Sequence, residues 1–232
     1  MAGIIAHLAI AREILKLLPK NTIENEGLFY AGSIAPDAIH ARESFVRAEK
    51  KHIHLRDDIP DKDFAIIENL ELFHKRVADF ITINIVRDDA LLDLYRGFVV
   101  HILTDELFVL TIRQEFTEAM EELGIAQSDK AYYNNIITDL NRNDALLVKK
   151  CVGLEEVRLQ LEQVKPYQVE GYLSEKELND SRYWVINQHY CEVQENKEPD
   201  YISYERMLDF IHMAAENIAK RLSEGGNLPR MF

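Results

Sequence analysis

The chain has 232 residues, of which 47% are hydrophobic and 29% are charged, a balance that predicts one globular domain (1–232) with a sizeable core. Its 27 basic and 40 acidic side chains give a net charge of −13 with histidine counted as neutral, which argues against bulk nucleic-acid binding and against anionic membrane surfaces. The sequence contains no run of 18 apolar residues, so it predicts no transmembrane segment.

The two cysteines, Cys151 and Cys191, are too few for a disulfide framework or a thiolate zinc site. Two ordinary thiols are typical of a reducing compartment. The first residues enter an amphipathic helix without the basic segment that opens a signal peptide. We therefore expect a cytoplasmic protein.

The first predicted helix runs from Ile4 to Leu18, and His7 lies on its apolar seam. A short helical piece beginning at Glu26 leads into the turn Gly32–Asp37, in which proline sets the backbone and the final residue supplies a carboxylate. That aspartate could equally be the cap of a short helix. The segment 41–63 is polar and has no periodicity, so we expect it to be irregular.

The rest of the chain is also predicted to be helical. The helix at 64–85 leaves His74 beside its buried seam, at the surface, and a long central helix begins at Asp88 or Asp89 and reaches Leu123. No stretch shows convincing strand alternation. The predicted fold class is all-α. A helix that starts after a capping box of Ser174 and Glu177 is expected. Further helices are expected at 129–150, with a break near 141–143, at 153–164 and at 203–223.

The central helix carries two polar residues on an apolar seam. A buried carboxylate is costly unless it is paired, hydrogen-bonded or bound to a metal. His101 and Asp105, one helical turn apart, are therefore a candidate metal half-site, and Gly97, one turn earlier, leaves room beside it. The residues that share this face are Leu94, Phe98, His101, Asp105, Phe108 and Ile112.

Other parts of the chain offer the remaining ligands: His7, Asp37, and either His52 or His54. Histidine nitrogens together with carboxylate oxygens suit zinc or another borderline divalent ion. Asp105 has two oxygens and could bridge two ions roughly 3.5–4 Å apart, as in two-metal phosphoesterases.

The order of these motifs resembles the zinc-dependent phospholipase C family, whose superfamily includes the single-strand-specific zinc nucleases. The resemblance covers about the first half of the chain, and the second half matches only as further helices. It implies an all-α phospholipase C/nuclease fold that cleaves phosphate esters with up to three zinc ions. The motifs that carry it are the early His7, the G-x3-P-D turn Gly32–Asp37, the H-x2-D loop His54–Asp57, and G-x3-H-x3-D in Gly97, His101 and Asp105.

The resemblance also implies roles. One metal would be held by His54 and His101 together with Asp37 and Asp105, and a second by His7 with Asp105. His54 is preferred to His52 because the family's loop histidine is followed by the carboxylate that Asp57 supplies in this chain.

The chain departs from the family's pattern in three places. The family has a histidine six positions after the helix aspartate, where this chain has Thr111. Its closing His-x3-Glu pair follows soon after, whereas the only such pair in a helical context here is His212 and Glu216. The secreted members also use a processed amino terminus as a ligand, which a chain beginning with Met is not expected to supply. These departures leave one complete metal site and a second site. A third site either uses His212 and Glu216 or is absent, in which case these two residues are an ordinary surface pair.

The predicted function is hydrolysis of a phosphate ester by a metal-bound hydroxide, with Asp37 or Asp57 orienting the water or accepting its proton. The substrate is either a phospholipid or a soluble phosphate ester. An HD-type phosphohydrolase is disfavoured because no histidine is followed by aspartate, and a di-iron bundle because only Glu71–His74 fits its motif. The competing hypothesis is a non-catalytic or regulatory helical protein that keeps the fold and a residual metal site, which Thr111 favours.

Overall fold

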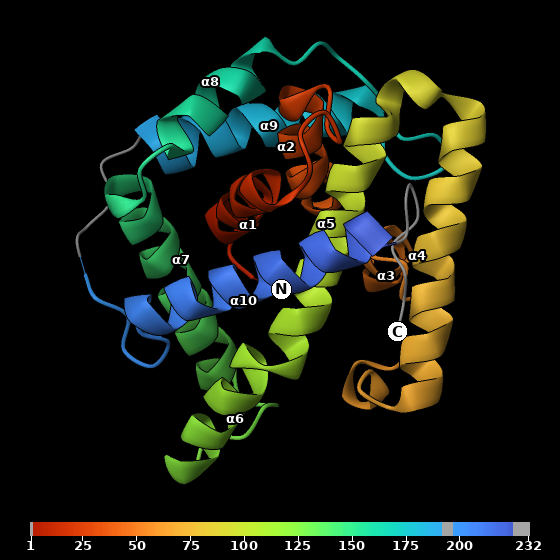
Figure 1. Cartoon of the computed structure of the whole chain (residues 1–232). Helices are drawn as coiled ribbons and strands as arrows, with labels where there is room; N and C mark the ends of the chain where they lie inside the picture. The colour runs from red at the N-terminus through yellow and green to blue at the C-terminus, as the bar shows by residue number, and fades with distance from the viewer. Residues whose placement is uncertain (1, 192–196, 225–232) are drawn as a thin grey trace.

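The computed structural model describes residues 2–191 and 197–224, which form an all-α bundle (Figure 1). Within these residues the only β pairing is an isolated bridge between Val169 and Leu173. The all-α prediction is confirmed. No helix in the described part of the chain has both the length and the apolar character needed to cross a membrane.

The bundle contains ten α-helices in the described residues, joined by short 3-10 and π segments. The α-helices are α1 (Ile4–Leu17), α2 (Glu26–Ile34), α3 (Arg47–Ile53), α4 (Ile67–Arg87), α5 (Leu92–Leu110), α6 (Ile112–Glu122), α7 (Lys130–Lys150), α8 (Leu154–Gln163), α9 (Glu175–Trp184) and α10 (Tyr204–Glu224). The short segments are η1 (Ala35–Ala41), η2 (Asp61–Asp63), η3 (Asp89–Leu91) and η4 (Val185–Cys191).

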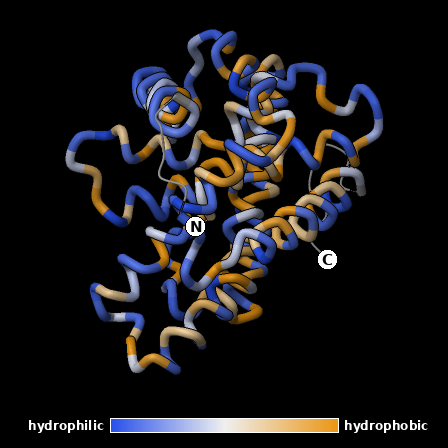
Figure 2. Tube along the Cα trace, turned by 90° about the vertical axis from the view of Figure 1, so that its left-hand side faces the viewer, coloured by the Kyte–Doolittle hydropathy of each residue, from blue (hydrophilic) through white to orange (hydrophobic). Residues whose placement is uncertain are grey.

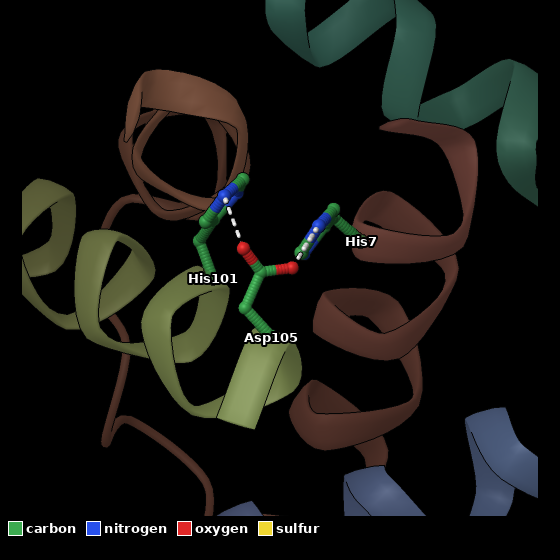
Figure 3. Close-up of side chains that lie close together, drawn as sticks. All are labelled: His7, His101 and Asp105. Carbon is green, nitrogen blue, oxygen red and sulfur yellow. Dashed lines mark ion pairs between the residues drawn. The ribbon is translucent and has the colours of Figure 1, made fainter. Parts of the chain in front are cut away.

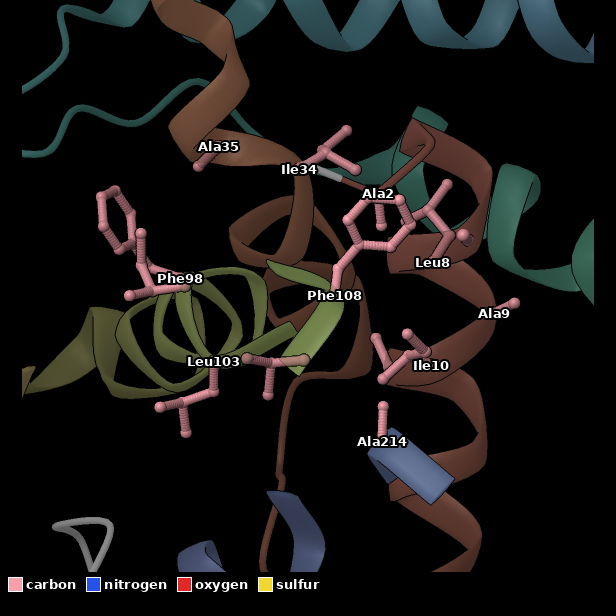
Figure 4. Packing of buried hydrophobic residues seen from close by; sticks show 14 of the residues in the cluster. Ala2, Leu8, Ala9, Ile10, Ile34, Ala35, Phe98, Leu103, Phe108 and Ala214 are labelled. Atoms are coloured by element: carbon pink, nitrogen blue, oxygen red, sulfur yellow. The ribbon is translucent and has the colours of Figure 1, made fainter. Parts of the chain in front are cut away.

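Helix α5 lies in the middle of the bundle and is buried along almost its whole length. It contacts α1, α2, α4, α6 and α10 (Figure 1). Its apolar side chains, among them Phe98 and Phe108, belong to one continuous core with Leu8 of α1 and Ala214 of α10 (Figure 4). Apolar and polar residues alternate along most of the other helices (Figure 2), as expected of helices that bury one stripe.

Two glycines allow α2 and α5 to cross with their backbones in contact. A Cβ atom at Gly32 would lie 2.1 Å from the carbonyl oxygen of Leu94, and one at Gly97 would lie 2.0 Å from that of Phe29. Our expectation that Gly97 leaves room at the metal site is therefore wrong. The space beside it is filled by the backbone of α2, and its role is to let that helix come close.

The long central helix is not continuous. Thr111 has φ −128° and ψ −87°, so α5 ends at Leu110 and α6 begins at Ile112. The Thr111 hydroxyl donates to the carbonyl of Leu107 at 2.7 Å. This hydroxyl therefore satisfies the end of α5 and faces its own helix, at the position where the family would have a histidine.

The segment 41–63, expected to be irregular, contains helix α3. Its first turn is closed by Glu49, whose carboxylate accepts the N–H of Val46 at 2.8 Å. The expected break in the helix at 129–150 is also absent, because α7 runs without interruption. The capping box of Ser174 and Glu177 is confirmed at the start of α9.

His74 is buried, not at the surface as predicted. Its Nε2 lies 2.6 Å from Glu106 Oε1 of α5, and the other carboxylate oxygen accepts from Arg221 of α10 at 2.7 Å. The ion pairs join three helices through side chains that are far apart in the sequence. Cys151 is a half-buried free thiol, and the side chain of Cys191 lies outside the described part of the structure.

The helix crossing generates a stability prediction. Gly97→Ala places a methyl group against the α2 backbone, so we expect it to lower the free energy of unfolding by about 2–3 kcal/mol, measured by urea denaturation. Gly124→Ala is the comparison, because Gly124 has φ +73° and open space around it, and only backbone strain of about 1 kcal/mol is expected. A Gly97→Ala protein as stable as the wild type would contradict the close crossing.

Candidate metal centre

Five side chains from four elements converge beside α5: His7 of α1, Asp37 of η1, His54 at the end of α3, and His101 and Asp105 of α5. They form two overlapping groups suited to hold a metal ion. One group is His7, His101 and Asp105, and the other is Asp37, His54 and His101. In each group, one ligand atom per residue lies within 4.8 Å of the others.

Asp105 faces both groups with different oxygens. Its Oδ1 lies 3.5 Å from Nε2 of His7 (Figure 3). Its Oδ2 lies 3.8 Å from Nε2 of His101 and 3.8 Å from Nε2 of His54. Asp105 thus turns a separate oxygen toward each group.

Asp37 closes the opposite side of the cluster. Its Oδ1 lies 3.5 Å from Nε2 of His54, and its Oδ2 lies 4.0 Å from Nε2 of His101. The 3-10 segment η1 follows α2 directly, so the aspartate position depends on how α2 sits against α5. Two carboxylates thus face three imidazoles.

Main-chain carbonyls orient two of the imidazoles. His101 donates from Nδ1 to the carbonyl of Ser33 at 2.9 Å, and His54 donates from Nδ1 to the carbonyl of Lys50 at 2.9 Å. A histidine that donates from Nδ1 presents the lone pair of Nε2 to a metal. The ring of His7 stacks on that of His101, with centroids 3.8 Å apart. The orientation is therefore set before any ion binds.

The cluster contains several buried polar atoms without a hydrogen-bond partner among the described residues. They include Nε2 of His7, of His54 and of His101, together with Oδ1 of Asp37. A buried polar atom without a hydrogen bond destabilises the folded protein by about 1–3 kcal/mol. The presence of several such atoms in one cluster therefore requires an explanation. A divalent ion provides one, because imidazole nitrogen and carboxylate oxygen are its ordinary ligands. The residues present therefore fit a metal.

The ionisation of the cluster also suits a metal. Burial, and then the nearby His7, lower the pKa of His101 from 6.5 to about 3. Burial by itself would raise the pKa values of Asp37 and Asp105. His54 holds the pKa of Asp37 below its ordinary value, and the charge of the amino terminus, followed by His7 and His101, does the same for Asp105. Neutral imidazole and charged carboxylate are the forms that bind metal.

A buried carboxylate that sequence reasoning missed anchors His7. Asp144 of α7 accepts the N–H groups of Ile5 and Ala6, each at 3.2 Å, and so fixes the start of α1. Burial raises the pKa of Asp144 to about 7 despite these bonds. It lies on an apolar helical stripe with Leu140 and Leu147, the same signal that singled out Asp105.

His52 and Asp57 lie outside the two groups. His52 is exposed, its Nδ1 lies 3.0 Å from Asp57 Oδ2, and its ring stacks on Tyr172 with centroids 5.1 Å apart. All three line a cavity of about 780 Å³ between α3 and residues 168–177. Of the two candidate loop histidines, the structure thus places His54 in the cluster and His52 outside it.

His212 and Glu216 do not join the cluster either. Both are exposed on α10, while Phe210, Ala214 and Ile218 form the buried stripe of the same helix. Among the described residues, neither belongs to a group that could hold a metal. Of the two alternatives for this pair, the described part of the chain therefore supports an ordinary surface pair.

The chain matches no protein-family model, no curated protein and no solved structure. The likeness to the zinc-dependent phospholipase C family therefore remains a prediction from motifs.

The cluster predicts metal content. We expect protein purified without added metal to contain about one or two divalent ions per chain by elemental analysis. Asp105→Asn should lose them, because its oxygens face both groups, and His52→Ala should keep them. Added zinc should stabilise the wild type by about 2.7 kcal/mol at a hundred times the dissociation constant. Full metal content in Asp105→Asn would contradict the assignment.

The pKa of His101 predicts a pH dependence of the metal-free protein. The pKa of His101 is about 3 in the folded protein, against an ordinary value of 6.5 for an exposed histidine. Between these two pH values the unfolded chain binds a proton at His101 that the folded protein does not bind. The free energy of unfolding should therefore fall as the pH falls below 6.5, by up to about 1.4 kcal/mol for each pH unit. Urea unfolding in chelator should give a shallower slope for His101→Gln. Equal slopes for the two proteins would contradict the prediction.

Proposed function

We propose that this protein is a metal-dependent phosphoesterase and that zinc is the ion its ligands suit best. The observation that carries the proposal is the set of buried, unpaired Nε2 atoms on His7, His54 and His101, which face two carboxylates. One of those carboxylates, Asp105, directs separate oxygens to the two groups. Such an arrangement suits two neighbouring divalent ions, as in phosphoesterases that work with paired metals.

The charge of the cluster supports a phosphate ester as the substrate. Metal-binding imidazoles carry no proton on the ligating nitrogen, so the two carboxylates would give the ligand set a charge of about −2, which a single divalent ion would cancel. A second ion would make the site positive within a protein of net charge −13. A bound divalent ion supplies a Lewis acid for a phosphoryl oxygen and lowers the pKa of a water molecule.

Two main-chain carbonyls and one carboxylate hold and orient the ligand set. The Ser33 and Lys50 carbonyls fix His101 and His54, and Asp144 fixes the helix that carries His7. Asp37 is better suited to hold an ion than to accept a proton, because its lowered pKa makes its carboxylate a weak base. We do not propose Asp57 as the proton acceptor, since it pairs with His52 outside the cluster.

The side of the cluster formed by Asp37 is its most open part. The side chains of His7 and His101 are 0% exposed, whereas that of Asp37 is 13% exposed. A substrate would therefore reach the centre past η1. A soluble phosphate ester and the head group of a phospholipid share the phosphoryl group that this site would bind, and we propose the soluble ester because of the acidic surface charge.

The depth of the cluster also favours a second candidate function, a metal that holds the fold together without catalysis. The ligands come from α1, η1, α3 and α5, so one centre would join four elements that the sequence separates. Such a protein would bind zinc and be stabilised by it, but would hydrolyse no ester.

Hydrolysis separates the two candidate functions. We expect the zinc-loaded protein to release nitrophenol from p-nitrophenyl phosphate or bis(p-nitrophenyl) phosphate, and Asp105→Asn to reduce kcat by about 10²–10³-fold or more. His52→Ala and Asp57→Asn should keep both the zinc and most of the rate, because they lie outside the cluster. Full zinc content without hydrolysis of any phosphate ester in a broad panel would favour the structural role.

A further inference from the structure

A lysine lies at the open side of the cluster. Nζ of Lys50 in α3 is 3.6 Å from Oδ1 of Asp37, the same oxygen that lies 3.5 Å from Nε2 of His54. Among the described residues, Lys50 is the only lysine or arginine within 4 Å of the Asp37 carboxylate. A positive charge thus stands at the edge of a group of metal-binding side chains, in a strongly acidic protein.

Lys50 is held at both ends. Its carbonyl accepts from the backbone N–H of His54 at 3.0 Å and from Nδ1 of the same residue at 2.9 Å. Its ammonium lies 2.7 Å from Nε2 of His40, whose ring packs edge-on against Phe45. The side chain is only 18% exposed, so the ammonium does not sample solvent freely as a surface lysine does.

The donors of this ammonium outnumber its partners. An ammonium has three N–H donors. One is used by Nε2 of His40 at 2.7 Å, whereas Oδ1 of Asp37, at 3.6 Å, is an ion-pair partner beyond hydrogen-bond distance. The carboxylate oxygen that Lys50 faces would itself be bound to a metal in the loaded protein. A donor then remains for an anion that enters past Asp37, the most open side of the cluster.

We propose that Lys50 binds a non-bridging phosphoryl oxygen of the substrate and makes the site selective for phosphate esters. This inference rests on the proposed function. A lysine acts on phosphate as a point charge, so its contribution is to affinity for the anion and not to the position of the metal ligands. The contact with Nε2 of His40 holds the ammonium beside Asp37.

Binding of inorganic phosphate to the zinc-loaded full chain tests the proposal by isothermal titration calorimetry. A hydrogen bond to a charged group is worth enough that Lys50→Met should weaken phosphate binding about 10- to 100-fold. Lys50→Arg should keep most of the affinity because it keeps the charge. Lys75→Met, which removes an exposed lysine paired with Asp79, is the control for net charge and should bind phosphate as the wild type does.

Zinc content and thermal stability are measured for every variant. They should be unchanged in Lys50→Met, because His54 is held by the Lys50 carbonyl, which the substitution keeps. Lys50→Gln replaces Lys50→Met if the latter loses zinc. Loss of zinc in both would overturn the proposal, because the side chain would then serve the metal site and not the phosphate.

The proposal is also overturned if the wild type does not bind phosphate, or if Lys50→Met binds it equally well. Failure of the proposed function has a different signature. Phosphate binding that depends on Lys50, without hydrolysis of any ester, would keep Lys50 as a phosphate-binding residue but would contradict the proposed enzymatic function. If Lys50→Met hydrolyses phosphate esters with the KM of the wild type, the role of Lys50 is contradicted while the proposed enzymatic function still stands.

Discussion

The backbones of α2 and α5 meet at Gly32 and Gly97, and the candidate metal centre depends on that contact. Because the two helices touch, the carbonyl of Ser33 reaches Nδ1 of His101 at 2.9 Å. The same approach carries η1, which follows α2 without a loop, so that Asp37 faces the imidazole that Ser33 orients. A side chain at either glycine would separate the helices and move both the ligand and its support.

The cluster is a local cost to the fold until an ion binds. Four buried imidazole nitrogens and one carboxylate oxygen have no hydrogen-bond partner among the described residues, and the surrounding core is apolar. The rest of the structure tolerates this cost because firm contacts hold the helices nearby, such as the Asp144 carboxylate at the start of α1. Metal binding would remove the cost, and thereby couple the stability of four elements to one centre.

The sequence correctly predicts the helices that have strong apolar periodicity. It also predicts that His101 and Asp105 share one face of a helix, because both predictions follow from the 3.6-residue helical repeat. It misses α3, whose residues show no apolar stripe and whose first turn depends on the Glu49 carboxylate. It also misses the burial of His74, since the partners that make burial tolerable, Glu106 and Arg221, come from distant helices. Residue spacing identifies which side chains share one face of a helix. Whether a charged side chain on that face can be buried depends on the partner that another helix supplies.

The support of the ligands is the part of the site that side-chain motifs cannot reveal. The main-chain carbonyls of Ser33 and Lys50 hold His101 and His54. Every residue has such a carbonyl, so the amino-acid type at these positions does not predict this role. Under our proposal the side chain of Lys50 would have a second function, because the short helix that places its carbonyl under His54 also places its ammonium beside Asp37. A phosphate-binding charge and a metal-ligand support would then be two ends of one residue, so the anion and the metal would share the same short helix.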